Sequence, residues 1–322
     1  MTRYFHHFLL KLPPEISHHI AVCFLKIYQR FCCRSTSLLR TSGVGIKVHG
    51  APEIVFPGSV GLAAGFDKNA ECFAALSRLG FGFIEVGTVT PEPQTGNPKP
   101  RLWRVSPEGL INQMGFNNCG VQVFKGNIRK FHGQCSVPLL ANIGKNKNTP
   151  NETAIEDYRF LLQELQQEVD GFVVNVSSPN TVGLRDLQSV EFLEKIESLA
   201  PQKPVWVKLA PDLSKENLLE LIRKVAQSPV FSGCVLTNTS REIALNDYQK
   251  TTGGYSGTKL FERVLEVVGN AREILKEKKS IIAVGGINSA ERAKKMRMAG
   301  ADLLEVYTAF VYQGPQLIRK LM

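Results

Sequence analysis

Short apolar runs separated by longer amphipathic segments dominate the chain after residue 50. Eight such runs occur: VGLAAG (60–65), FIEVG (83–87), LLANI (139–143), FVVNV (172–176), VWVKLA (205–210), CVLTN (234–238), IIAVGG (281–286) and LLEVYT (303–308). Apolar residues at helical spacing lie between most of them, in segments 154–165, 190–199, 215–226, 260–275 and 290–298. Near-continuous apolar strands that alternate with helices indicate a parallel sheet covered by helices.

The number of these units predicts a closed barrel. Eight strand–helix units after residue 50 fit a (β/α)8 TIM barrel, which typically takes about 250 residues. We therefore predict an α/β fold with an N-terminal helical segment over residues 1–48 and a barrel over residues 49–322. An open doubly wound sheet is the alternative, but such sheets usually carry Gly-x-Gly-x-x-Gly after the first strand, and GLAAGFDKN does not match that pattern.

Polar side chains or glycines stand at or just after the end of every predicted strand. They are Asp67, Lys68, Thr88, Asn142, Asn175, Lys208, Thr237, Asn238, Gly285, Gly286, Tyr307 and Thr308. Any one of them alone is explained more simply as a helix cap or a turn residue. A closed barrel brings them to one rim, which is the active-site face. Amides, hydroxyls and two lysines without a histidine suit a planar polar heterocycle better than a hydrolytic water.

The last two strands predict a phosphate site. Barrels commonly bind phosphate with the loops after strands seven and eight, and here VGGINS (284–289) supplies two glycines followed by two cap residues. A phosphate at this place and a conjugated ring over the barrel centre describe flavin mononucleotide. Lys208 would then lie where negative charge grows on the reduced ring.

The first 48 residues differ from the rest in charge. They carry seven basic residues against the single acidic residue Glu15, and so hold +6 of the net charge of +10. Their apolar residues follow a helical spacing, which is typical of a helix pair lying in a membrane interface. The alternative is a pair that only caps the core of the barrel. The apolar positions are Tyr4, Phe5, Phe8, Leu9, Leu10, Leu12, Ile16, Ile20, Phe24, Ile27 and Phe31.

Several classes of protein are disfavoured. The sequence contains no run of about 20 apolar residues, which is the length needed to span a bilayer. Its first 15 residues do not have the pattern of a signal peptide. The seven scattered cysteines show no metal-binding spacing, so we expect reduced thiols and no metal, with Cys32 and Cys33 packing at a helix end. We recognise no nucleic-acid-binding motif. The expected location is the cytoplasmic face of a bacterial inner membrane.

The motifs together resemble the dihydroorotate dehydrogenases of pyrimidine (UMP) synthesis, and the similarity covers nearly the whole chain. The motifs that carry it are GLAAGFDKN, EVGTVTP, NPKPRLWR, INQMGFNN, NIGKNK, VNVSSPNT, TNT, GGYSG, VGGI and EVYTAFVYQGP. The resemblance implies an FMN-containing barrel that oxidises dihydroorotate to orotate. Its membrane-associated, quinone-using branch has a serine as the base, at the position of Ser178, whereas the soluble branches have a cysteine. The proton from this serine could pass to Thr181 or to a chain of waters.

The resemblance also assigns binding residues by position. The substrate residues are Lys68, Asn112, Gln113, Met114, Gly115, Phe116, Asn175, Asn180, Asn238 and Thr239. The FMN residues are Ala64, Gly65, Thr88, Asn142, Asn175, Lys208, Thr237, Gly257, Gly286, Tyr307 and Thr308. For the quinone the matches are His18, Arg104 and Tyr307.

Three residues depart from the family pattern, and two other functions remain as alternatives. Gln113 replaces a frequent arginine, Val182 a usual proline, and Tyr255 a commoner leucine.

We expect a monomeric peripheral membrane flavoenzyme that binds no nucleic acid. The alternatives are a soluble FMN barrel that passes electrons to fumarate or NAD, and a non-catalytic basic protein that binds membrane or nucleic acid.

Overall fold

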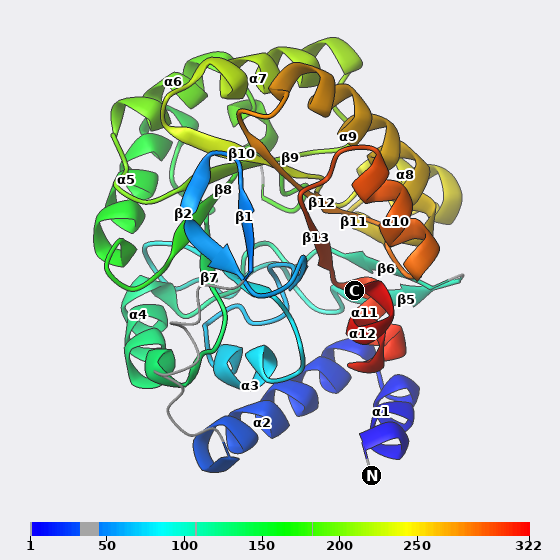
Figure 1. Cartoon of the computed structure of the whole chain (residues 1–322). Helices are drawn as coiled ribbons and strands as arrows, with labels where there is room; N and C mark the ends of the chain where they lie inside the picture. Colours follow the sequence, from blue (N-terminus) through cyan, green and yellow to red (C-terminus); the bar gives the residue numbers. More distant parts are fainter. Residues whose placement is uncertain (1, 33–44, 107, 182) are drawn as a thin grey trace.

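Eight parallel strands close into a barrel at the centre of the molecule (Figure 1). The computed structural model describes residues 2–32, 45–106, 108–181 and 183–322, without the side chains of residues 2–5 and 32. The barrel strands are β3 (Val60–Leu62), β4 (Phe83–Val89), β7 (Leu139–Ile143), β8 (Gly171–Asn175), β9 (Val205–Leu209), β10 (Phe231–Leu236), β12 (Ser280–Val284) and β13 (Leu303–Val306). The last strand pairs with the first, so the predicted TIM barrel is confirmed.

Helices cover the outside of the barrel (Figure 1). They are α3 (Phe73–Ser77), α4 (Gly120–Phe131), α5 (Ala154–Leu165), α6 (Val190–Ser198), α7 (Lys215–Gln227), α9 (Phe261–Leu275), α10 (Ala290–Met298), α11 (Thr308–Gln313) and α12 (Gln316–Leu321). Single turns of 3-10 helix lie at His132–Gln134, Asn151–Thr153, Leu184–Leu187 and Thr258–Leu260. The side chains of Ser189, Ser214 and Ser289 cap the first turns of α6, α7 and α10.

Near the amino ends of the strands, the barrel interior is filled by apolar side chains. Phe83, Leu140, Trp206 and Leu303 belong to a buried cluster there. A hairpin of β1 (Ile46–Val48) and β2 (Ala51–Phe56) adds its own apolar residues to the same cluster. Because side chains alternate along a strand, the residues two and four positions after Leu303 also face the interior, nearer the rim. Binding groups are therefore confined to the half of the barrel at the carboxyl ends of the strands.

The two longest connections meet over the rim. They contribute β5 (Leu102–Val105), β6 (Gly109–Asn112), α8 (Arg241–Tyr248) and β11 (Gly254–Gly257). The three strands form an antiparallel sheet in the order β11-β6-β5, with Gly254 opposite Asn112. This sheet, which the sequence did not predict, covers the carboxyl ends of the barrel strands.

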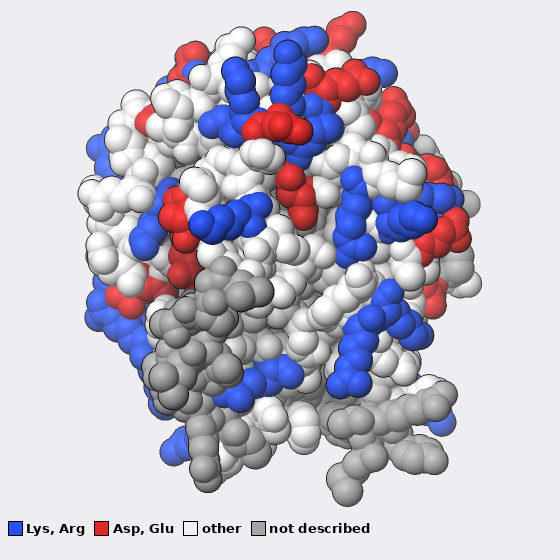
Figure 2. Space-filling model, in the orientation of Figure 1, with Lys and Arg blue, Asp and Glu red and all other residues white. Residues whose placement is uncertain are grey.

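Two N-terminal helices, α1 (Thr2–Lys11) and α2 (Pro14–Cys32), confirm the predicted helix pair. Among the described residues, none of the helices has both the length and the apolar character needed to cross a bilayer. On the face in Figure 2, the region of α1, α2, α11 and α12 shows basic side chains among uncharged ones, while acidic side chains lie higher, over the barrel. Cys33, Arg34, Arg40 and Val182 lie outside the described residues. The boundary after residue 48 stays a prediction.

Candidate active site

A cavity at the carboxyl ends of the strands contains most of the residues that the sequence predicts for a site. Its lining includes Ala64, Gly65, Lys68, Thr88, Asn112, Met114, Gly115, Phe116, Asn175, Ser178, Asn180, Lys208, Thr237, Asn238, Thr239 and Tyr307. A smaller cavity shares Ser256, Gly285 and Tyr307 with it and adds Gly257, Gly286 and Thr308. The two cavities therefore lie side by side and share part of their walls, between the loop after β8 and the glycines after β12.

A chain of hydrogen bonds joins the strand ends beneath this cavity. Asn238 Nδ2 donates to Ser177 Oγ at 2.9 Å, and Ser177 Oγ donates to Asn175 Oδ1 at 3.1 Å. Asn175 Nδ2 donates to Asn142 Oδ1 at 3.0 Å, and Asn142 Nδ2 donates to Glu85 Oε1 at 2.6 Å. Asn142 is therefore not part of the lining but fixes the amide of Asn175, which is. Such a network holds the polar rim in one arrangement.

Lys208 lies between two buried carboxyl groups. Its Nζ is 2.8 Å from Glu85 Oε2 and 3.6 Å from Glu305 Oε2. Burial lowers the pKa of Lys208, but the two carboxyl groups outweigh burial, so the net shift is upward. Glu85 also accepts from the N–H of Ala64, at 2.8 Å, and its pKa is lowered because these donors outweigh burial. Lys208 and Glu85 are thus an ion pair in the floor of the site.

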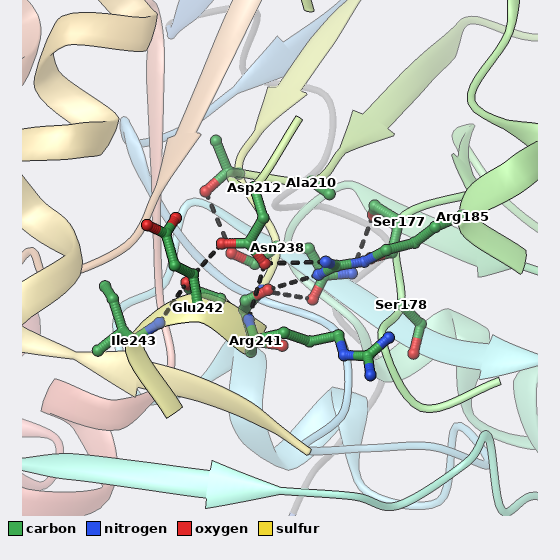
Figure 3. A network of polar contacts seen from close by, with 12 residues as sticks. Ser177, Ser178, Arg185, Ala210, Asp212, Asn238, Arg241, Glu242 and Ile243 are labelled. Carbon is green, nitrogen blue, oxygen red and sulfur yellow. Dashed lines mark hydrogen bonds and ion pairs between the residues drawn. The ribbon is translucent and has the colours of Figure 1, made fainter. Parts of the chain in front are cut away.

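The loop after β8 carries Ser177 and Ser178 and is called the serine loop below. Contacts of Arg185 hold it in place. Arg185 Nε donates to Ser177 O at 3.1 Å, and its Nη2 donates to Thr239 O at 2.9 Å. Figure 3 shows the same guanidinium directed at Asp212, with Nη1 and Oδ2 2.8 Å apart. Asp212 also accepts from Ser240 Oγ and from the N–H of Arg241. The ion pair therefore ties the loop after β8 to the loop after β9, and the hydrogen bonds to Thr239 O, Ser240 and Arg241 extend this contact to the loop after β10.

Ser178 itself is buried and lines the cavity. Its Oγ accepts from the N–H of Asn180 at 3.3 Å. Asn180 Nδ2 donates to Asn112 Oδ1 at 2.9 Å, which links the serine loop to the sheet above the rim. Among the described residues, Asn180 Oδ1 and Thr239 Oγ1 are buried without a hydrogen-bond partner, as is Thr181 Oγ1. Buried polar atoms left free in this way indicate a place for a polar ligand.

Lys68 is, with Lys208, one of two lysines that line the cavity. Its Nζ donates to Gly65 O at 2.6 Å. Burial, helped by the charge of Arg101, lowers the pKa of Lys68 to about 8. The ammonium therefore remains the majority form at neutral pH and suits an anionic group on a ligand.

Glycines form the far end of the site. Gly286 has φ +70°, and a Cβ there would lie 2.7 Å from Phe261 N. Gly257 has φ +137°, and its Cβ would lie 2.5 Å from Glu108 O. Any other residue would be strained and would clash with backbone at both places. Both glycines line the smaller cavity together with Thr308, so backbone groups and a hydroxyl lie at this end of the site.

A separate groove lies under α2. His18 lines it, and Lys68, Leu102 and Met114 line both the groove and the cavity. The ring of His18 lies 5.2 Å from that of Phe66, which in turn lies 6.3 Å from that of Tyr307. His18 Nε2 donates to Phe66 O at 2.7 Å, and burial with the charge of Lys68 lowers the pKa of His18 to about 4. His18 is therefore neutral, with its proton on Nε2.

Two other predicted residues lie apart from the cavity lining. Arg104 Nη1 donates to Leu12 O, in the turn between α1 and α2, and its Nε is buried without a partner among the described residues. The side chain of Gln113 donates a hydrogen bond to Pro100 O and accepts one from Thr252 Oγ1. It therefore contacts neighbouring loops and does not line the cavity. Tyr255 is buried and stacks on Tyr248 at 5.5 Å.

Polar contacts hold α2 on the barrel. The buried amide of Gln29 accepts from the N–H groups of Ala74 and Ala75, at the start of α3. Arg101 Nη2 lies 3.0 Å from Glu15 Oε1. The groove at His18 is thus fixed relative to the cavity.

Comparison with known proteins identifies the family. The model of the family described as dihydroorotate dehydrogenase matches residues 48–322. The chain belongs to the dihydroorotate dehydrogenase family. Proteins named dihydroorotate dehydrogenase (quinone) are similar over 97% of this chain, with 39% identity in Nitratiruptor sp. and 42% in Christiangramia forsetii, covering 90% and 94% of those proteins.

Solved structures of family members have the same fold. The crystal structure of DHODH from Eimeria tenella in complex with ferulenol matches with a TM-score of 0.83 and 32% identity, over 96% of this chain and 89% of that one. The ligand-free structure from the same organism matches with a TM-score of 0.83 and 33% identity, over 96% and 93%.

The sequence did not reveal several residues of the site, among them Glu85, Arg185, Asp212 and Glu305. Glu305 stands two residues before Tyr307, which was named at a strand end, so the alternation of side chains could have placed it facing inward. Glu85 stands three residues before Thr88, and β4 has an irregularity between Gly87 and Val89, so alternation does not place it. For Arg185 and Asp212 the sequence holds no such signal, because their contact joins two loops 27 residues apart.

Proposed function

We propose that this chain oxidises (S)-dihydroorotate to orotate, with FMN as the hydride acceptor and a membrane quinone as the final oxidant, in de novo synthesis of UMP. The similarity to quinone-named relatives over nearly the full length supports this. The observation that carries it is that Ser178 and Lys68 line one cavity together with four asparagines, which are Asn112, Asn175, Asn180 and Asn238.

FMN fits the residues present. A flavin supplies a hydride acceptor, which no protein side chain provides. Gly257, Gly286 and Thr308 would hold its phosphate, while Thr88, Thr237 and the ion pair of Lys208 would lie along the sugar chain and ring. Two features support the fit: the close-packed glycine backbone and the free carboxyl of Glu305 at the smaller cavity.

Dihydroorotate suits the other half of the cavity. Its carboxylate would pair with the ammonium of Lys68. Its ring carries alternating N–H donors and C=O acceptors, and asparagine offers one of each. The free Asn180 Oδ1 could accept from a ring N–H.

Ser178 would take the proton. Oxidation removes a proton from the carbon beside a carbonyl while hydride leaves the adjacent carbon for the flavin. Serine is a weak base, so it depends on a fixed position and on exclusion of water. The sheet of β5, β6 and β11 above the rim supports such exclusion. The proton could then pass to Thr181, whose Oγ1 is buried and free among the described residues, or to a chain of waters.

The quinone would approach from the groove under α2. A quinone oxygen accepts hydrogen bonds, and the unpaired Nε of Arg104 is a suitable donor. Because His18 already donates through Nε2, its Nδ1 is an acceptor, suited to the O–H of the reduced quinol. Tyr307, linked to His18 through Phe66, would lie between this site and the flavin.

The N-terminal helices would hold the enzyme on the membrane. Apolar residues of α2 recur on a helical spacing and are solvent-exposed: Ile16 by 53%, Phe24 by 51%, Ile27 by 60% and Phe31 by 75%. An exposed apolar stripe beside Lys26 and Arg30 suits an anionic lipid surface. The placement on the cytoplasmic side of an inner membrane and the monomeric state belong to the same proposal.

Steady-state kinetics test this function. We expect orotate to form from dihydroorotate when a quinone is added, with parallel double-reciprocal plots, because two half-reactions use one flavin in turn. Intersecting lines would contradict a shared flavin. Turnover with fumarate or NAD but not with quinone would favour the soluble alternative.

A further inference from the structure

Glu305 is a buried carboxyl group that the proposed reaction does not use. It stands on β13, midway between Leu303 in the barrel core and Tyr307 at the rim, and its side chain is fully buried. Both of its oxygens lack a hydrogen-bond partner among the described residues. It nevertheless lines the smaller cavity together with Gly257 and Gly286. Because buried polar groups are nearly always hydrogen-bonded, such a position indicates a hydrogen bond to a bound ligand.

The charges around Glu305 determine its protonation. The groups that face it are Lys208 at 3.6 Å, Glu85, which interacts directly with it as well as with Lys208, and Glu108 and Tyr307 in the same cavity lining. The strands on either side place Val284 and Gly61 opposite it, which carry no charge. Lys208 is already paired with Glu85 at 2.8 Å, so a second carboxylate would leave an uncompensated buried negative charge. Burial and the charge of Glu85 raise the pKa of Glu305 well above its usual range.

We propose that Glu305 is a flavin-binding residue whose neutral carboxyl group donates its O–H to the bound flavin from the floor of the barrel. The proposal rests on the proposed function, since it requires that a flavin occupies the cavity. A neutral carboxyl offers one donor and one acceptor, which suits the hydroxyl groups of the sugar chain or the polar edge of the ring. An ionised Glu305 would repel the phosphate and the negative charge that hydride transfer leaves on the flavin.

Binding of FMN to the apoprotein tests this inference without any turnover. Quenching of FMN fluorescence gives the affinity from neutral to alkaline pH. In the unchanged protein we expect affinity to fall by on the order of tenfold as Glu305 ionises. In Glu305→Gln, which keeps a donor and an acceptor but cannot ionise, we expect near-native affinity at neutral pH and no such fall. The matched control is Glu273→Gln, at an exposed position of α9 outside both cavity linings, which should retain the native pH dependence.

An infrared difference spectrum of FMN addition at neutral pH examines the native carboxyl directly. A protonated carboxyl band that shifts on FMN binding, and that is missing from Glu305→Gln, is expected. The role of Glu305 is overturned if no protonated band responds, or if both proteins share one pH dependence of FMN affinity. Failure of the unchanged protein to bind FMN at any pH would instead overturn the proposed function.

Discussion

Arg185 and Asp212 form an ion pair behind the serine loop, with Nη1 and Oδ2 2.8 Å apart. The remaining nitrogens of Arg185 donate to Ser177 O and Thr239 O, so one guanidinium fixes the loops after β8 and β10 relative to each other. Lysine has the charge but a single ammonium that cannot reach three acceptors in different directions. Arg185→Lys should therefore slow flavin reduction by about 10- to 100-fold, through displacement of Ser178.

Rapid mixing with dihydroorotate measures that loss. The amount of bound flavin should stay unchanged, because Arg185 does not line the cavity. Arg159→Lys is the matched control, since Arg159 makes only an exposed ion pair with Glu156. A native rate in Arg185→Lys would show that the pair does not position the serine.

Ser178→Ala removes the proposed base. Loss of a general base costs about 100- to 10,000-fold in rate, so flavin reduction should slow by that factor while flavin and orotate still bind. Stopped-flow absorbance follows the reduction and fluorescence titration follows the binding. Ser198→Ala changes an exposed serine on α6 and should have no effect. A fast Ser178→Ala enzyme would move the base to another residue.

The lowered pKa of Lys68 makes substrate binding sensitive to pH. The ammonium exists below its pKa of about 8 and is lost as the pH rises through that value. The KM for dihydroorotate should therefore be flat below about pH 8 and rise by up to about tenfold per pH unit above it. Lys68→Arg should move the rise to higher pH, because arginine keeps its charge. A KM that is independent of pH in both proteins would remove Lys68 from carboxylate binding.

The exposed stripe on α2 should determine membrane binding. Each buried Phe or Ile side chain contributes about 1.5–3 kcal/mol, so Phe24→Asp with Ile27→Asp should weaken binding to anionic vesicles by about 100-fold or more. Vesicle flotation measures it. Flavin reduction should be unchanged, because both residues are exposed and lie outside the cavity lining.

Met298→Asp is the control for that double variant. Met298 is 77% exposed, but it lies on α10, outside the N-terminal helices. It should leave flotation unchanged. Equal loss in the two variants would indicate a general effect of added charge, and no loss in either would place the membrane contact elsewhere.

The barrel was predictable because its strands are short, mostly apolar runs separated by helical segments. A run such as LLANI is buried on both faces, and the structure has it as β7 with the predicted bounds. The strand ends then followed, since parallel strands deliver them to one rim. The sheet over the rim was not predictable, because β6 and β11 are far apart in the chain and β11 contains two glycines.

Contacts between loops and side-chain directions were also beyond the sequence. Gln113 belongs to a motif of the family, yet its amide bonds Pro100 and Thr252 rather than lining the cavity. His18 was expected to offer a polar tip to a quinone. Its bond to Phe66 O, which fixes the proton on Nε2, depends on how α2 packs on the barrel.

Anaerobic titration of the purified protein with dihydroorotate tests the central claim most directly, because the claim is that separate strand ends hold one flavin against one substrate. The flavin absorbance should bleach in proportion to added dihydroorotate, one equivalent for each flavin, and should return when a quinone is added. A protein that carries no flavin, or a flavin that dihydroorotate does not bleach, would contradict the account.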